Sequence, residues 1–185
     1  MIKLSKYKAC ICEGSAEKAI MNILLDNDLL IFKREELLEE EVLSCRSAKN
    51  FEERYLRKTF DDKISVIRIL DSRKENFKLS KAYENKVDVI NIITAPEIEI
   101  LAIIKEDKYL DFKKSKLKPS DYCKQVLRMS HVKNYDSVIE YFSDADTLVE
   151  AIKKYKEIKN LPKGELTLID LLADPAGPPE GRRTD

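Results

Sequence analysis

The stretch ACICEGSAEK, residues 9–18, joins a short apolar run to an acid, a glycine and a second acid. The run that ends at Glu13 is typical of a buried strand, and SAEKAIMNILLDND (15–28) has the apolar spacing of a helix. A strand that ends on a carboxylate, turns at once on Gly14 and starts a helix with Glu17 in its first turn is the opening of a βαβ unit. The sequence therefore predicts an α/β fold.

The next eighty residues continue this alternation. Strand patterns occur at LLIF (29–32), ISVIRIL (64–70) and VDVINII (87–93), and helical patterns occur from Ser47 to about Phe60 and at KENFKLSKAYEN (74–85). The charge-dense stretch 33–45 fits a helix, a strand plus loop, or both. Strands that alternate with helices predict an open, mostly parallel sheet with helices on both faces.

The rest of the chain is predicted to be helical. Thr94 and Glu97 have the spacing of a capping box, with Pro96 in the first turn, and further helical patterns follow at 119–129, 135–142 and 143–159. The expected N-caps of these last three helices are Ser120, Asp136 and Asp144. We expect an α/β core over 1–112, a helical extension packed on the same domain over 113–160, a short strand or helix within 161–173, and a disordered or vector-encoded tail over 174–185.

Composition excludes several classes of protein. The chain has 185 residues, enough for one domain, and its 34 basic residues balance 34 acidic ones, so no overall field attracts it to nucleic acid or membrane. No apolar run approaches the roughly 20 residues of a membrane helix, and the N-terminal apolar run is too short for a signal peptide. We therefore expect a cytoplasmic protein with no membrane partner.

The cysteines and the single histidine do not have the spacing of a zinc site. Cys10, Cys12, Cys45 and Cys123 form no C-x-x-C pair, and we expect them to be buried free thiols. His131 is expected to be a surface or capping residue.

Acidic residues follow three of the predicted strands. Glu13 and Asp71 directly end apolar strands, and Glu97 and Glu99 come shortly after the third. The carboxyl ends of parallel strands line the ligand crevice of such sheets, so these carboxylates are expected to converge and to favour a hard cation such as Mg²⁺. Alternatively, they are ordinary helix-start residues stabilised by the helix dipole.

At this point the chain resembles a known family. CICEGSAEKAIMNILL (10–25) is similar to the first motif of Toprim domains, a strand followed by E-G-x-x-E and a helix, as in the OLD-type and RloB-like nucleases of bacterial phage defence by abortive infection. The resemblance implies that Glu13 is the catalytic glutamate, Gly14 the turn glycine and Glu17 the second acid.

Two later segments extend the resemblance. ISVIRILDSRKE lies where the family has its D-x-D motif, which implies a catalytic, metal-binding role for Asp71, but Arg73 replaces the second aspartate and the next carboxylate is Glu75. NIITAPEIEILAII resembles the N-P-x-x-E segment of RloB-like proteins and implies that Glu97 or Glu99 supports the site.

If these roles hold, the chain cleaves phosphodiesters. Glu13, Asp71 and Glu75 would bind Mg (or Mn), and the protein would be a nuclease in a phage-defence or toxicity system, with a partner ATPase. Because of Arg73, the alternative is a catalytically degenerate Toprim-like subunit that acts as a binding or regulatory module. A third interpretation is an α/β protein that binds a small anion at its strand ends.

A nucleic acid, DNA or RNA, needs local basic contacts on this neutral chain. The stretch KYLDFKKSKLKPSDYCK (108–124) supplies Lys113, Lys114, Lys116 and Lys118, and its aromatic residues Tyr109, Phe112 and Tyr122 are candidates for stacking on bases. The alternative is a solvated lysine-rich linker.

Overall fold

The structure is a computed structural model and describes residues 2–74, 76–94, 97–129, 133–159 and 162–174. It contains strands, α-helices and two 3-10 helices. The strands are β1 (Tyr7–Cys12), β2 (Leu37–Leu43), β3 (Ile64–Leu70) and β4 (Val87–Ile93). The helices are α1 (Ser15–Asp26), η1 (Arg34–Glu36), α2 (Ala48–Tyr55), α3 (Glu97–Lys105), α4 (Tyr109–Ser115), α5 (Pro119–Gln125), α6 (Tyr135–Tyr141), α7 (Ala145–Ile158) and η2 (Leu168–Leu171).

The four strands form one parallel sheet in the order β2-β1-β3-β4, which confirms the predicted α/β class. The chain passes from β1 to β2 on one side of β1, and then to β3 on the other side. The carboxyl ends of β1 and β3 therefore meet where the winding direction reverses, the usual position of a ligand crevice in sheets of this kind.

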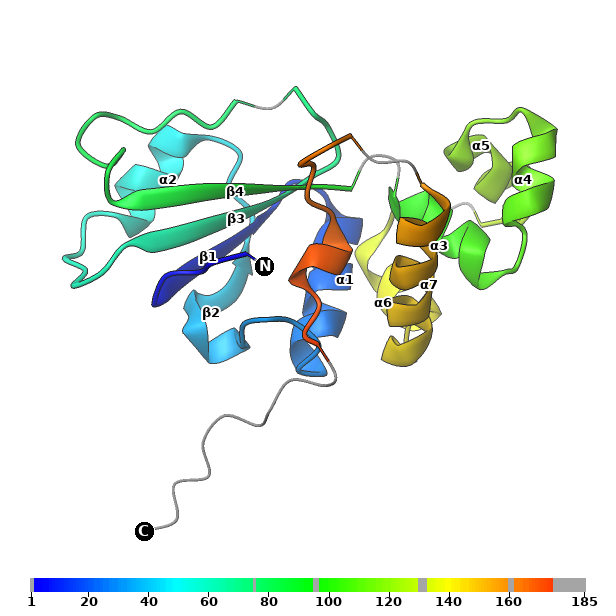
Figure 1. Cartoon of the computed structure of the whole chain (residues 1–185), viewed down its shortest axis with the longest axis horizontal. Coiled ribbons are helices and arrows are strands. Elements are labelled where there is room, and N and C mark those ends of the chain that lie inside the picture. The colour runs from blue at the N-terminus through cyan, green and yellow to red at the C-terminus, as the bar shows by residue number, and fades with distance from the viewer. Residues whose placement is uncertain (1, 75, 95–96, 130–132, 160–161, 175–185) are drawn as a thin grey trace, which may run out of the picture.

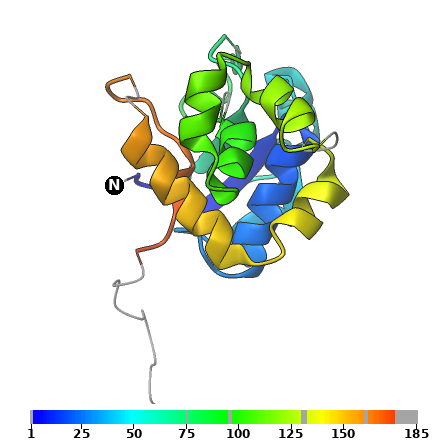
Figure 2. The ribbon, with the colours of Figure 1, turned by 90° about the vertical axis from the view of Figure 1, so that its right-hand side faces the viewer.

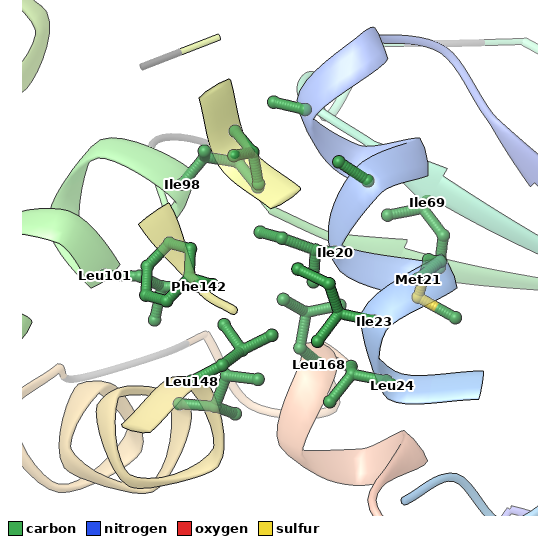
Figure 3. Packing of buried hydrophobic residues seen from close by; sticks show 14 of the residues in the cluster. Ile20, Met21, Ile23, Leu24, Ile69, Ile98, Leu101, Phe142, Leu148 and Leu168 are labelled. Carbon is green, nitrogen blue, oxygen red and sulfur yellow. The ribbon is translucent and has the colours of Figure 1, made fainter. Parts of the chain in front are cut away.

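Helices cover both faces of the sheet (Figure 1). The larger core lies between one face and the helices α1, α3, α5, α6 and α7 together with η2, and Figure 3 shows Ile20 and Leu24 of α1 at its centre. Figure 2 looks onto the C-terminal helices, which lie in front of the strands. The smaller core on the other face contains Ile11, Val66 and Phe51 of α2. Helices of the expected extension share the larger core with the sheet. Residue 112, where the α/β core was expected to end, lies inside α4.

The prediction of a second strand at residues 29–32 is wrong. Residues 29–32 are not a strand, although Leu30 forms one bridge with Leu172, and β2 lies instead within the ambiguous stretch at 37–43. Its pairing with β1 jumps from Leu37 to Val42, and Glu39 and Glu40 both have positive φ. This bulge turns charged residues of the edge strand outward, which hid the alternation that identifies a strand.

The helix predicted over 74–85 is also wrong. Its described residues form turns and extended chain, with Leu79 buried against the smaller core and Phe77 packed beside it. These two side chains are two residues apart and reach the same core, which suits extended chain rather than a helix.

Some predicted helix starts are confirmed and others are not. Ser47 caps α2 and Asp144 caps α7, each by accepting a hydrogen bond from a backbone N–H. Ser120 and Asp136 are not caps, because Lys118 and Asn134 occupy those positions. Thr94 instead donates its hydroxyl to the carbonyl of Leu70 at 3.0 Å, and Pro96 lies outside the described residues.

The C-terminal segment returns to the sheet. Leu166 forms a parallel bridge with Ile92, and the Ile93 N–H donates to the Leu166 carbonyl at 2.9 Å, at the open side of β4. All four cysteines are buried and free, as predicted. None of the helices in the described part of the chain is both long enough and apolar enough to span a bilayer.

Candidate functional site

A buried ion pair lies where β1 and β3 end. Arg68 of β3 donates from Nη2 to Oε1 of Glu13 at 3.2 Å, with the two side chains 1% and 8% exposed. The Arg68 guanidinium also lies over the Phe77 ring, 4.6 Å from its centroid. A buried carboxylate or guanidinium is tolerated only when it is paired, so each of these charges stabilises the other.

Glu13 and Asp71 leave their strands toward opposite faces. In β1 and β3, side chains alternate between the two cores, and continuing this alternation puts Glu13 on the face of Ile11 and Arg68, and Asp71 on the face of Ile69. In register, Cys12 pairs with Ile69, so Asp71 lies one residue further along its strand than Glu13. A one-residue offset places side chains on opposite faces of a sheet.

A second charged group occupies the face of Asp71. It contains the buried carboxylates Glu17 and Glu99 and the exposed Lys133, whose Nζ is 3.0 Å from Oε1 of Glu99. Burial, followed by the negative charges of Asp71 and Glu99, raises the pKa of Glu17 against the opposing effects of a backbone hydrogen bond and Lys133. Desolvation alone would lower the pKa of Lys133, but the bond to Glu99 and the charges of Glu17 and Asp71 raise it. Lys133 thus offsets part of the negative charge of the three acids on this face.

The turn at Gly14 leaves room for the side chain of Glu17. The Gly14 backbone has an ordinary φ of −111°, but a Cβ built there would lie 2.1 Å from Oε2 of Glu17. The carboxylate of Glu17 therefore folds back over the turn, into the position that a Cβ at residue 14 would occupy. This explains the spacing of the E-G-x-x-E motif in steric terms rather than by backbone strain.

A cavity of about 470 Å³ opens beside the ion pair. It is lined by Glu13, Gly14, Ser15 and Lys18 around the start of α1, by Ser44 after β2, and by Tyr135 of α6. Hydroxyl groups and an ammonium group near a helix N-terminus are donors suited to an anion. The cavity could therefore receive a phosphate group.

Other predicted site residues lie apart from this cavity or outside the description. Arg73 forms a bidentate ion pair with Glu165 at 2.6 and 2.7 Å, which anchors the C-terminal segment. Glu75 and His131 lie outside the described residues, as does the side chain of Glu97.

Positively charged side chains of the protein occupy part of the strand-end site. Within the described ranges, no group of three or more histidine, cysteine, aspartate or glutamate side chains is placed to hold a metal. Glu13 is ion-paired with a buried arginine, and Glu99 is ion-paired with Lys133. Positive side chains of the protein thus lie beside the carboxylates that a cation would need.

The predicted basic stretch forms the surface of α4 and α5. Lys113, Lys114, Lys116 and Lys118 are exposed, and none makes an ion pair with a described residue. The aromatic residues below them pack on one another, with ring centroids 6.1 Å apart for Tyr109 and Phe112 and 5.4 Å apart for Phe112 and Tyr122. The expectation that all three stack on bases is wrong for Tyr122, because it is buried in the core.

Sequence reasoning missed the two cations of the site. Arg68 carried a usable signal, because a single charge in an otherwise apolar strand must find a partner when the sheet is covered on both faces. The sequence contains no comparable signal for Lys133, because this residue approaches Glu99 only through the packing of the C-terminal helices.

Comparisons with models of known protein families, with curated proteins and with solved structures found no match.

Proposed function

We propose that this chain is a catalytically degenerate Toprim-like module, which binds nucleic acid and in which the strand-end carboxylates Glu13 and Glu99 are neutralised by the protein's own cations. The observation that carries the proposal is the buried Glu13–Arg68 pair at 3.2 Å. The resemblance assigns catalysis to the carboxylate of Glu13, which is paired with the guanidinium of Arg68. Because arginine is always charged, it remains a partner for this carboxylate and cannot itself accept a proton from water or substrate.

The replacement of an aspartate by Arg73 supports the same conclusion. Its guanidinium is held by Glu165 on the C-terminal segment, so this position contributes to the fold and supplies no carboxylate. Lys133 supplies a second positive charge beside Glu99. The site thus keeps the shape of the E-G-x-x-E turn while two of its carboxylates, Glu13 and Glu99, are paired with cations of the protein.

Binding is assigned to the basic surface of α4 and α5. These helices lie beyond α3, on the side toward which the strands run (Figure 1). Four lysines there, which make no ion pair with a described residue, contact phosphates without reading sequence, because the charge of the backbone is the same at every step. The free buried cysteines are consistent with a cytoplasmic location.

Thermal melting with added Mg²⁺ or Mn²⁺ tests the neutralised site. A metal at 100 times its Kd would stabilise the folded chain by about 2.7 kcal/mol. For a chain of this size that corresponds to a Tm increase of roughly 5–11 °C. We expect a shift below about 1 °C, and a larger increase that Glu13→Gln abolishes would refute the proposal.

Salt-dependent binding tests the basic surface. For labelled duplex DNA, each phosphate contact contributes about 0.9 to the slope of log K against log salt, so four lysines contribute roughly 3–4. Replacing Lys113, Lys114, Lys116 and Lys118 by Gln should remove that contribution. The matched control replaces Lys153, Lys154, Lys156 and Lys159 on and after α7, and equal losses in both variants would contradict the assignment.

A second candidate is the metal-dependent nuclease of a phage-defence system, with a partner ATPase. The observation that favours it is the shared electrostatic environment of Glu17, Asp71 and Glu99, three carboxylates on one face of the strand ends. The melting experiment separates the two candidates, because only the nuclease needs the metal.

A further inference from the structure

A second cavity lies at the opposite end of the strands. The loop between α2 and β3 and the turn before β4 enclose about 420 Å³ at the amino ends of β3 and β4. In Figure 1 these loops lie at the end of the sheet away from α4 and α5. The volume falls within the range of about 300–1,000 Å³ that is usual for small-molecule sites.

The walls of this cavity are held in place. The Ile64 N–H donates to the Lys86 carbonyl at 3.0 Å, and the Lys86 N–H donates to the Tyr83 carbonyl at 2.9 Å, so the two loops are joined. Phe60 is fixed edge-on against Tyr7, with ring centroids 5.1 Å apart. Tyr83 lines the cavity half-buried and makes no ring contact with another described aromatic residue, so its ring can pack against a ligand.

The charged residues of the lining leave an excess of positive charge. Two of its four cations are committed elsewhere, because Lys58 pairs with Glu39 at 3.1 Å and Lys63 pairs with Asp88 at 2.9 Å. The other two, Arg57 and Lys86, make no ion pair with any described residue.

The acids of the lining do not neutralise Arg57 and Lys86. Asp61 is ion-paired with Lys6 at 2.9 Å, and Asp62 accepts from the backbone N–H groups of Lys6 and Lys63. Arg57 and Lys86 thus outnumber Asp62, the acid of the lining that makes no ion pair with a described residue, and a net positive charge is left for a ligand.

We propose that this cavity binds a small anion that carries a flat ring, of the size of a nucleoside monophosphate. The phosphate contacts Arg57 and Lys86, because guanidinium and ammonium groups form charge-assisted hydrogen bonds to phosphate oxygens. The ring packs against Tyr83 over the buried floor of Leu56 and Val87. The cavity lies at the amino ends of the strands, so this site is independent of the strand-end site and of the function proposed for it.

Isothermal titration calorimetry with three probes tests the proposal. We expect AMP to bind at least about tenfold more tightly than adenosine, which lacks the charge, and than inorganic phosphate, which lacks the ring. Equal binding of AMP and adenosine, or no heat from AMP at millimolar concentration, would overturn it.

Two variants locate the binding. Arg57→Gln with Lys86→Gln should weaken AMP at least about tenfold, and Tyr83→Leu should weaken AMP while leaving phosphate binding unchanged. The matched control, Lys153→Gln with Lys156→Gln, removes the same charge from α7 and should change AMP binding less than about twofold. Because Arg57 and Lys86 are exposed, their double variant should melt within about 2 °C of the wild type. Unchanged AMP affinity in this folded variant would refute the assignment.

Discussion

The Glu13–Arg68 pair predicts a large energetic coupling between two residues that are 55 positions apart in sequence. Glu13→Gln keeps the shape of the side chain but leaves the guanidinium of Arg68 buried without its counter-charge. Arg68→Met keeps a long apolar stem but leaves the Glu13 carboxylate without its cation. Each change should destabilise the fold by about 3–5 kcal/mol, the usual cost of breaking a buried ion pair from one side.

The effect should be visible in melting temperatures. A loss of 3 kcal/mol lowers Tm by roughly 6–12 °C in a chain of this size. Glu13→Gln should be the more damaging change, because an unpaired carboxylate can take up a proton whereas arginine keeps its charge. The double variant removes both charges together and should cost clearly less than the sum of the single changes.

A double-mutant cycle, measured by urea unfolding, isolates the pair itself. The cycle is needed because both side chains also interact with further groups, as Arg68 does with the Phe77 ring. We expect a coupling free energy of about 2–3 kcal/mol, at the upper end of values for contacting residues. The exposed pair Lys58–Glu39, with a similar separation of 3.1 Å, is the control and should couple by less than about 1 kcal/mol.

A coupling no larger than that of the control pair would refute the reasoning. It would mean that water or other groups satisfy both charges in the folded chain. The carboxylate of Glu13 would then be available for other chemistry, and the argument for a neutralised site would lose its main support.

Two further predictions concern Glu17 and Gly14. Because burial raises the pKa of Glu17 above its ordinary value of 4.5, the folded chain binds a proton more tightly there than the unfolded chain does. Wild type should therefore lose stability relative to Glu17→Gln as pH rises from about 4.5 through the raised pKa, and a constant difference in urea unfolding between about pH 4 and 8 would exclude this effect. Gly14→Ala should cost about 1–2 kcal/mol because its Cβ displaces the Glu17 carboxylate. The same change in a Glu17→Ala background should cost less than about 1 kcal/mol, and equal costs in both backgrounds would show that the steric explanation is wrong.

The sequence predicted those parts of the fold that follow from local periodicity. The strands at 7–12 and 64–70 are mainly apolar runs, as central strands covered on both faces require, and the edge strand at 87–93 is rich in Val and Ile although Asp88, Val89 and Asn91 are exposed. β2 was missed because its exposed Glu39, Glu40 and Glu41 belong to a bulge, and no periodicity describes a bulge.

The site was predictable only in part, because its geometry depends on register. The sequence identified the acids that follow the strands, yet the faces onto which they project depend on how β1 and β3 pair. Knowing that Cys12 pairs with Ile69 is enough to separate Glu13 from Asp71. No local pattern contains that information, and the same holds for Lys133, which reaches Glu99 from a segment 34 residues further along the chain.

The C-terminal segment has a role beyond the contacts already described. An open strand border offers unsatisfied backbone groups to any other chain, and proteins protect such borders against aggregation. Here the two borders are protected differently: β2 carries a bulge and three outward glutamates, whereas β4 depends on Leu166, fastened nearby by the Arg73–Glu165 pair. Replacing both Arg73 and Glu165 by Gln, which leaves the buried Leu168 and Leu171 in place, should therefore loosen this cover and promote self-association through β4, with clouding at high concentration as the visible sign.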